Sequence, residues 1–406
     1  MAVKAVCGST VLTAVTSGSE TAQTAVLSFP ANTSSQDIMT YTVTAPGVTA
    51  QVLVAKASAT DESEELDLAA FRVGFKTASL TLTDNIALNF KATVQEPIGL
   101  LGDYTVGALF WTREPAAYTV LHSPALQVES GGVNGGFYQL ESGTGYHVFT
   151  YDDIAAKEMN DTIYTVPYVK YQGRYIYGDP LAYSVAQFGK TVLNGTYSDE
   201  FKTLAVDMLN YGAEAQTYFN YRTDALANAG LTPEQLALGT QEAVELTNGQ
   251  ATLGTASDYA AFTAASLSLE SYVSLNYKAA VNPVSGYTID SVTMYYSDTY
   301  TDEADWTARR DAGELQSVPM ANNGVNYTGS VRDIVAKGLR DSFYTQVQVT
   351  YTNGTDPVTE TSSILQFSVA DFAYLARQNG SDALENLTDA LMKYGDSAKI
   401  YFETLQ

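Results

Sequence analysis

Asp and Glu are the residues of this chain that could take part in the widest range of chemistry. The chain contains 45 of them and 21 Lys and Arg. Paired carboxylates can serve as general acid and general base. Asp153 and Asp161 recur 180 residues later as Asp333 and Asp341. Aspartates also cap turns and pair with lysines such as Lys157, and these four recur together with hydrophobic landmarks, which favours a structural role. We therefore expect no catalytic residues and no enzyme activity.

Outside the linker and the acidic run at 61–67, the densest acidic cluster contains Asp298, Asp302, Glu303 and Asp305. Carboxylate oxygens are preferred ligands of Ca²⁺, but the spacing lacks the alternate-position oxygens and the turn glycine of an EF-hand. The alternatives are a solvated acidic loop and a weak calcium site at Asp298, Asp302 and Asp305. No other cofactor is expected.

Cysteine and histidine are scarce, with Cys7 the only cysteine and His122 and His147 the only histidines. This scarcity excludes a disulfide framework, structural zinc of the usual kind and Cys–His catalysis.

Tyrosine is abundant, at 29 of 406 residues. Tyr168, Tyr171, Tyr175 and Tyr177 fall on one predicted hairpin. Exposed rings there can stack on sugars or anchor a protein partner, because tyrosine offers a large rigid surface at low entropic cost. The alternative is cross-strand aromatic packing within the domain. These four residues are the candidate ligand-binding site.

The formal charge of −24 excludes nucleic acid as a partner, since affinity for phosphate backbones depends on Lys and Arg. No stretch approaches 18 continuous apolar residues, so membrane insertion is not expected. The first seven residues, Met-Ala-Val-Lys-Ala-Val-Cys, show no apolar core of a signal peptide.

An internal duplication organises the chain. Residues 78–91, 153–171 and 204–219 recur in the same order at offsets of 187, 180 and 183. Offsets that change so little indicate two homologous domains whose length differences lie in loops.

The predicted boundaries follow from the duplication. Residues 63–230 form copy 1, residues 257–406 form copy 2, and residues 231–256 form a linker with one short helical turn. Residues 61–67 are strongly acidic and read as a solvated boundary. Residues 1–62 form a small β domain, with strands at 39–44 and 48–54, and this domain is a possible attachment element.

Each copy ends in two predicted helices. Ser184 and Ser368 fit the start of the first helix, and Ser198 and Ser381 fit the start of the second, because a serine oxygen accepts an unpaired amide of the first turn. The second helix carries an apolar stripe at helical spacing with a glycine inside it. Its signature residues are Leu204, Tyr211, Gly212 and Tyr218, repeated as Leu387, Tyr394, Gly395 and Tyr401. The two glycines should permit close backbone approach.

The earlier part of each copy is rich in β-branched and aromatic residues at period two. Asn353-Gly354 predicts a two-residue type I′ hairpin, and residues 171–175 offer its counterpart in copy 1. The predicted fold class is α+β, mostly β: two homologous β-sandwich-like domains, each closed by two C-terminal helices, preceded by the small N-terminal β domain.

The helix motif of residues 209–219, together with Ala78-Ser-Leu-Thr-Leu82 and residues 392–398, carries a family resemblance. It resembles an uncharacterised tandem accessory region of large secreted or surface proteins of gut Clostridia, of the Lachnospiraceae and Ruminococcaceae type. The resemblance spans residues 70–406 and implies a non-catalytic region in an extracellular or cell-surface setting.

Two functions follow as hypotheses. The first is a non-catalytic surface module that binds or spaces, with a glycan or a cell-surface protein as partner. The alternative is a structural protein of a virion or appendage, such as a phage fibre or decoration protein, which docks or self-assembles through the N-terminal domain.

Overall fold

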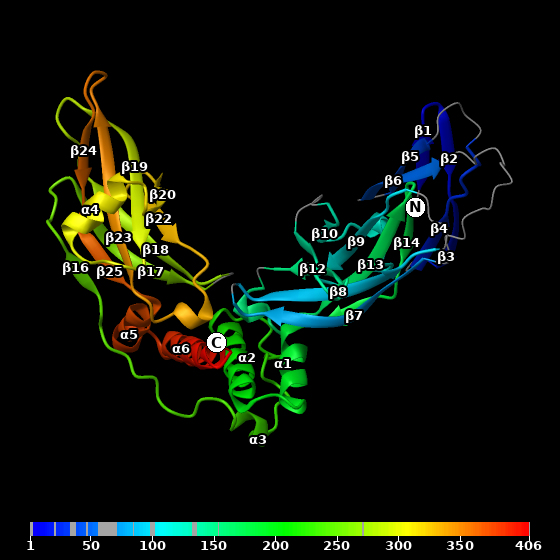
Figure 1. Ribbon diagram of the computed structural model, residues 1–406. Coiled ribbons are helices and arrows are strands. Elements are labelled where there is room, and N and C mark those ends of the chain that lie inside the picture. The colour runs from blue at the N-terminus through cyan, green and yellow to red at the C-terminus, as the bar shows by residue number, and fades with distance from the viewer. Residues whose placement is uncertain are drawn as a thin grey trace.

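The computed structural model describes residues 3–19, 22–32, 38–45, 48–55, 71–83, 85–97, 102–131, 136–152, 154–269 and 272–405. A small β domain leads into two β-sandwiches, each followed by two helices. The helices of the two copies meet at the vertex of a V whose arms are the sandwiches (Figure 1). The predicted α+β, mostly β fold class is confirmed.

The N-terminal domain is a sheet of order β2-β1-β5-β6 with a separate β3–β4 ribbon. The strand–turn–strand prediction is confirmed, because β5 and β6 pair from Ile38↔Ala55 to Ala45↔Val48. Tyr41 is buried and contacts Phe29 edge-on, with ring centroids 5.2 Å apart. The acidic residues 61–67 lie outside the described residues. The strands are β1 (Lys4–Cys7), β2 (Thr10–Thr13), β3 (Val15–Ser19), β4 (Ala22–Val26), β5 (Ile38–Ala45) and β6 (Val48–Ala55).

Copy 1 packs two antiparallel sheets face to face. One has the order β11-β12-β8-β7, and the other β10-β9-β13-β14 with β15 also paired to β13. Its strands are β7 (Arg72–Thr81), β8 (Ala87–Gln95), β9 (Thr105–Trp111), β10 (Leu126–Glu129), β11 (Phe137–Leu140), β12 (His147–Tyr151), β13 (Ile163–Tyr171), β14 (Arg174–Tyr177) and β15 (Leu181–Tyr183). Short 3₁₀ turns, η2 (Val120–His122) and η3 (Ala156–Glu158), connect them.

Copy 2 repeats this arrangement with additions at one edge. Its sheets have the orders β17-β18-β22-β21 and β16-β25-β23-β19-β20, with β24 also paired to β23. Its strands are β16 (Ala251–Leu253), β17 (Ala260–Ser268), β18 (Ser274–Val281), β19 (Thr288–Ser297), β20 (Gln316–Pro319), β21 (Ala321–Asn322), β22 (Tyr327–Val331), β23 (Phe343–Thr352), β24 (Val358–Thr361) and β25 (Ile364–Phe367). A helix α4 (Glu303–Asp311) and a 3₁₀ turn η4 (Ala336–Gly338) complete it.

The duplication extends to an irregularity of the sheets. The β7–β8 ladder shifts register between Phe75 and Thr77, and the β17–β18 ladder shifts between Phe262 and Ala264. Both bulge positions differ by the offset of 187 that the sequence predicts. Since a bulge kinks and twists its strand, the two sheets bend at the same place.

The predicted helix starts are confirmed. Ser184, Ser198, Ser368 and Ser381 each accept a hydrogen bond from the backbone N–H three residues on. These caps stabilise helix N-termini by about 1 kcal/mol each. They begin α1 (Val185–Asn194), α2 (Asp199–Tyr218), α5 (Val369–Asn379) and α6 (Asp382–Glu403).

The predicted apolar stripe is confirmed in its centre and wrong at one end. Leu204, Tyr211, Leu387 and Tyr394 are buried, but Tyr218 is 40% exposed. Tyr218 is the last residue of α2, where the helix extends beyond the elements that cover its middle. Its counterpart, Tyr401, is half-buried.

The two signature glycines permit the close approach that the sequence predicts. A Cβ atom at Gly212 would lie 2.9 Å from Met159 Sδ and 3.2 Å from Ala156 O. One at Gly395 would lie 2.7 Å from Leu339 Cδ1 and 3.0 Å from Ala336 O. Each glycine therefore lets its helix contact the 3₁₀ turn of its own copy, η3 or η4.

The hairpin prediction holds in copy 1 and is wrong in copy 2. Tyr171 pairs directly with Arg174, and the two turn residues have the positive φ of a type I′ turn. In copy 2, Tyr351 pairs with Val358, so the loop is longer than two residues. There Asn353 Oδ1 accepts bonds from two following backbone N–H groups, an Asx turn that competes with the tight hairpin.

The predicted linker 231–256 is structured at both ends. It contains a short helix α3 (Pro233–Leu236), capped by Thr232, which confirms the helical turn. Near its C-terminal end, β16 pairs with β25 and so belongs to the sheet of copy 2. Copy 2 therefore begins earlier than residue 257.

Candidate functional site

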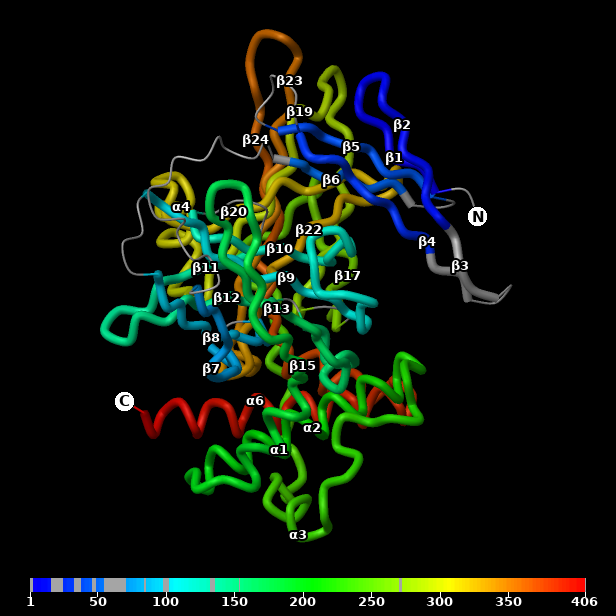
Figure 2. Tube along the Cα trace, turned by 90° about the vertical axis from the view of Figure 1, so that its right-hand side faces the viewer, coloured from blue at the N-terminus to red at the C-terminus, as the bar shows by residue number. Residues whose placement is uncertain are grey.

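The two copies meet through equivalent surfaces. Helices α2 and α6 lie side by side in both views (Figures 1 and 2), and the Tyr211 and Tyr394 rings stack with centroids 5.8 Å apart and planes at 11°. These tyrosines are counterparts at the offset of 183. A contact between a residue and its own counterpart is the pattern found on the two-fold axis of an isologous dimer interface, and we call the line through this contact the local two-fold axis.

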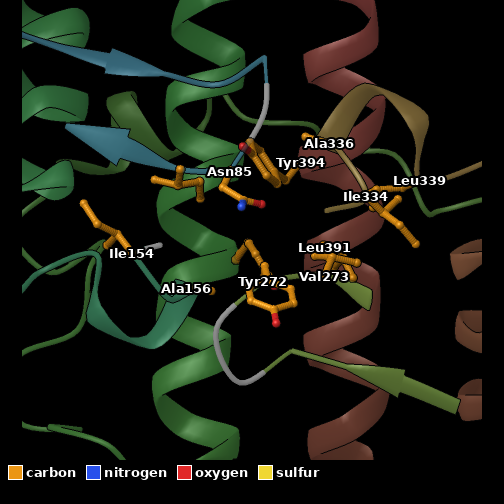
Figure 3. Close-up of a pocket in the computed structure, with 12 residues that line it drawn as sticks. Asn85, Ile154, Ala156, Tyr272, Val273, Ile334, Ala336, Leu339, Leu391 and Tyr394 are labelled. Carbon is orange, nitrogen blue, oxygen red and sulfur yellow. The ribbon is translucent and has the colours of Figure 1, made fainter. Parts of the chain in front are cut away.

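A small cavity lies on this axis (Figure 3). Most of its lining comes in counterpart pairs from the two copies, including Ile154 with Ile334 and Ala156 with Ala336. Its volume is about 40 Å³, which is room for about two or three water molecules. Burial raises the pKa of both Tyr211 and Tyr394 well above the usual range of tyrosine, so both phenols stay neutral. The cavity is a feature of the interface and is too small for an organic ligand.

The linker is fastened to this interface by three cationic side chains. Arg340 donates to Glu245 O at 3.0 Å, Arg377 donates to Val244 O at 3.0 Å, and Lys393 donates to Thr240 O at 2.9 Å. The two arginines also pair with carboxylates of α6, Arg340 with Asp396 and Arg377 with Asp389. We call these three residues, Arg340, Arg377 and Lys393, the linker clasp.

A second, polar cavity of about 390 Å³ lies beneath the linker. On its wall, the buried carboxylate of Asp207 accepts bonds from Thr240 N at 2.9 Å and Thr240 Oγ1 at 2.6 Å. Burial raises the pKa of Asp207. Burial alone raises the pKa of Glu214, which lines the same cavity. Asp207 thus holds the linker to α2 of copy 1, just as the linker clasp holds it to copy 2.

The candidate tyrosine site is partly wrong. Tyr168 is fully buried, where its hydroxyl donates to the Glu129 carboxylate, and Tyr171 is also buried. Neither ring can reach a ligand. Both are covered because β13 is a central strand with a hydrophobic cluster on each face, Tyr168 in one and Tyr171 in the other.

The other two tyrosines of that hairpin are half-buried. Tyr175 and Tyr177 lie with their rings nearly parallel, at an 11° angle and 6.0 Å between centroids. Lys170 Nζ lies 5.5 Å from the centre of the Tyr175 ring. Aromatic packing, the alternative interpretation, therefore accounts for most of this cluster, and Tyr175 and Tyr177 are its accessible part.

The acidic side chains of the predicted cluster in copy 2 do not converge on one position. Asp302 caps α4 by accepting from Asp305 N at 2.9 Å, and Asp305 faces Arg309 at 3.9 Å, one turn along the helix. Within the part of the chain that the structure describes, no group of three or more His, Cys, Asp or Glu side chains could hold a metal ion. The calcium interpretation of Asp298, Asp302 and Asp305 is therefore not supported, because the helix uses Asp302 as its cap.

The repeated aspartates have separate partners. Asp161 accepts from the Tyr221 hydroxyl and pairs with Arg222. Asp333, in copy 2, accepts from Asn85 Nδ2 of copy 1 at 3.0 Å, so it bridges the copies. Asp153 lies outside the described residues. Lys157, predicted to pair with an aspartate, lies 5.1 Å from the centre of the Phe219 ring.

A cavity of ligand size lies in a groove on copy 1 that sequence reasoning missed. It has a volume of about 390 Å³, within the range of ligand pockets. It lies between β7, β15 and α1. Aromatic and polar side chains mix on its wall, among them Phe75, Lys76, Tyr183, Phe188, Thr191 and Tyr197. We call this cavity the copy 1 groove.

Copy 2 does not reproduce the composition of this groove. At the offsets of 187 and 184, Lys76 and Thr191 correspond to Thr263 and Leu375, and Tyr197 is one of two residues of copy 1 that copy 2 lacks between Asn379-Gly380 and Ser381. Tyr197 is 49% exposed and packs edge-on against Phe201 at 5.5 Å. This divergence between aligned copies was the available sequence signal, since architecture alone would preserve these positions.

Comparison with known proteins gives little. No protein-family model matches the sequence, and no curated protein matches it. Among solved structures, the chain is similar to a crystal structure of chicken CNTN1 FN1–FN3 domains, with 8% identity over 89% of this chain and 90% of that one, and a TM-score of 0.18. A TM-score this low supports no conclusion. Among the described residues, no helix has the length and apolarity needed to traverse a bilayer.

Proposed function

We propose that this chain is a non-catalytic module of an extracellular or surface protein, and that it holds two β-sandwich arms at a fixed angle. The observation that carries the proposal is the stacking of Tyr211 on its counterpart Tyr394 at the vertex of the V. A spacer must resist bending at its joint, and here the joint is packed.

Three features stiffen the joint. One hydrophobic cluster of buried residues runs continuously through both copies and both long helices. Phe201 of copy 1 stacks on Tyr401 of copy 2, with centroids 4.6 Å apart and planes at 11°. The linker clasp then ties the connecting segment to α6 and its neighbours. Two domains of a chain usually move relative to each other unless a large apolar interface joins them. Here one apolar cluster spans both copies.

The test is a distance measurement between the arms. Spin labels at Ser142→Cys and Val325→Cys, in a Cys7→Ser background, place one probe on an exposed site of each arm. Double electron–electron resonance should give one narrow distance distribution. Arg340→Met should broaden it, whereas Arg174→Met, at an exposed arginine within arm 1, should leave it unchanged. A broad distribution in the parent protein would refute the spacer.

Glycan binding is a second candidate function, favoured by the accessible pair Tyr175 and Tyr177. Near-parallel aromatic rings beside Lys170 offer an amphipathic surface of the kind that sugars contact. Affinity electrophoresis against cell-wall and plant polysaccharides tests this. Retardation that Tyr175→Ala abolishes would support it, and no retardation, or retardation that persists in Tyr175→Ala, would exclude it.

A further inference from the structure

The two copies differ at one sheet edge. In copy 2, β25 pairs with β23 on one side and with β16 on the other (Figure 1). Its counterpart in copy 1, β15, pairs with β13 through Thr165↔Leu181 and Ile163↔Tyr183. Among the described residues, no strand pairs with the outer edge of β15. Within the described ranges, copy 1 therefore has one strand fewer than copy 2 at this sheet edge.

The unpaired edge lies beside the copy 1 groove. Leu181 and Tyr183 of β15 line this groove, and Ala182 between them is exposed. The opposite wall is β7, itself an edge strand of the other sheet. An unpaired edge presents backbone N–H and C=O groups in the spacing that another strand can use.

We propose that the outer edge of β15 accepts an extended segment of a partner polypeptide as an added antiparallel strand. Copy 2 supplies the register, because Thr252 of β16 lies opposite Leu365, the counterpart of Leu181. The next position on that face, opposite the counterpart of Tyr183, is residue 250. Side chains alternate between faces of a strand, so residues of the partner at these two positions enter the groove.

The partner has a defined chemistry. Phe75, Tyr183 and Phe188 make the groove wall apolar near β15, so the two entering side chains are apolar and stand two residues apart. Backbone hydrogen bonds supply affinity, and the groove, which receives the two apolar side chains, supplies specificity, as in other cases of strand addition.

The chain itself is a poor occupant of this edge. At the offset of 187, the counterpart of β16 is residues 64–66, within a run whose residues 61, 62, 64, 65 and 67 are all acidic. These residues lie outside the described ones. Acidic residues are unfavourable in strands, and Asp179 on the groove wall would repel them.

The experiment uses the full chain and a labelled decapeptide. The peptide is residues 247–256 of this sequence with Gln250→Val and Thr252→Val, which gives β16 two apolar side chains at the groove positions. Fluorescence anisotropy should show saturable binding. Thr191→Trp, which fills the groove, should weaken binding by about tenfold or more, equivalent to about 1.4 kcal/mol. Gln187→Trp, exposed on the same helix but outside the groove, should not change it.

Two further measurements separate strand addition from simple occupation of the groove. A peptide that also carries Ala251→Pro cannot form the ladder and should not bind. Hydrogen exchange of the Ala182 amide, which points away from β13 because Leu181 and Tyr183 make the hydrogen-bonded pairs with Thr165 and Ile163, should slow when the unmodified decapeptide binds. Equal binding of the proline peptide, no saturable binding, or an Ala182 amide that is already protected in the free chain would each overturn the proposal. None of these outcomes affects the distance test of the spacer.

Discussion

Removal of the stacked tyrosines at the vertex should destabilise both helices together. Tyr211 and Tyr394 are 3% and 4% exposed. Truncation of a buried aromatic residue to alanine costs about 3–5 kcal/mol. A native protein has a free energy of unfolding of about 5–15 kcal/mol, so Tyr211→Ala or Tyr394→Ala alone should remove a large part of it.

The stack itself adds a coupling between the two positions. Aromatic pairs contribute about 0.5–1.5 kcal/mol beyond the area they bury. In a double-mutant cycle, each alanine substitution should therefore cost about that amount less when the other tyrosine is already alanine than when it is present. The equivalent burial of the two rings predicts single effects of similar size.

The assay is urea unfolding followed by circular dichroism at 222 nm, which reports mainly on the helices. Tyr218→Ala is the matched control, because Tyr218 is 40% exposed at the end of α2 and should cost less than about 1 kcal/mol. If Tyr211→Ala and Tyr394→Ala cost no more than this control, or if their effects simply add, the packed joint is not what holds the copies together.

Three further predictions concern single sites. Gly212→Leu should destabilise by at least about 1–3 kcal/mol, because even a Cβ would lie 2.9 Å from Met159 Sδ; an unchanged melting temperature would contradict this. Burial raises the pKa of Glu214 above 4.5, so its charged form destabilises the fold. Glu214→Gln should therefore raise the melting temperature at pH 7 and lose this advantage below pH 4.5, where glutamate is protonated in both states. Asp302→Ala should speed hydrogen exchange in α4, because it removes an N-cap worth about 1 kcal/mol. Millimolar Ca²⁺ should not alter hydrogen exchange of α4 in the parent protein.

Features that depend on local sequence could be predicted from it. The serine caps need only a side chain three residues from an amide, and the glycines need only a close neighbour, so both were predicted correctly. The bulge that both copies share was not predicted, but its position follows the offset of 187 of the duplication.

Features that depend on which surfaces meet could not be predicted. Tyr168 and Tyr171 lie three apart on one strand, so alternation places them on opposite faces, and only the structure shows that both faces of β13 are covered. Likewise, Tyr218 is the last residue of α2, where its ring contacts Phe219 but stays 40% exposed. The copy 1 groove lies beside an edge of β15 that has no neighbouring strand among the described residues, and the sequence indicates it only through the divergence between the two copies.

The local two-fold axis at the vertex has an evolutionary consequence. At the centre of this surface Tyr211 meets its counterpart Tyr394, and counterpart pairs line the cavity beside them, so two separate chains of a single repeat could associate through it as a homodimer. Joining two such genes end to end would yield the present arrangement with the pairing of subunits already in place. The connecting segment would then be the later acquisition, and the single-repeat ancestor would have been a symmetric dimer.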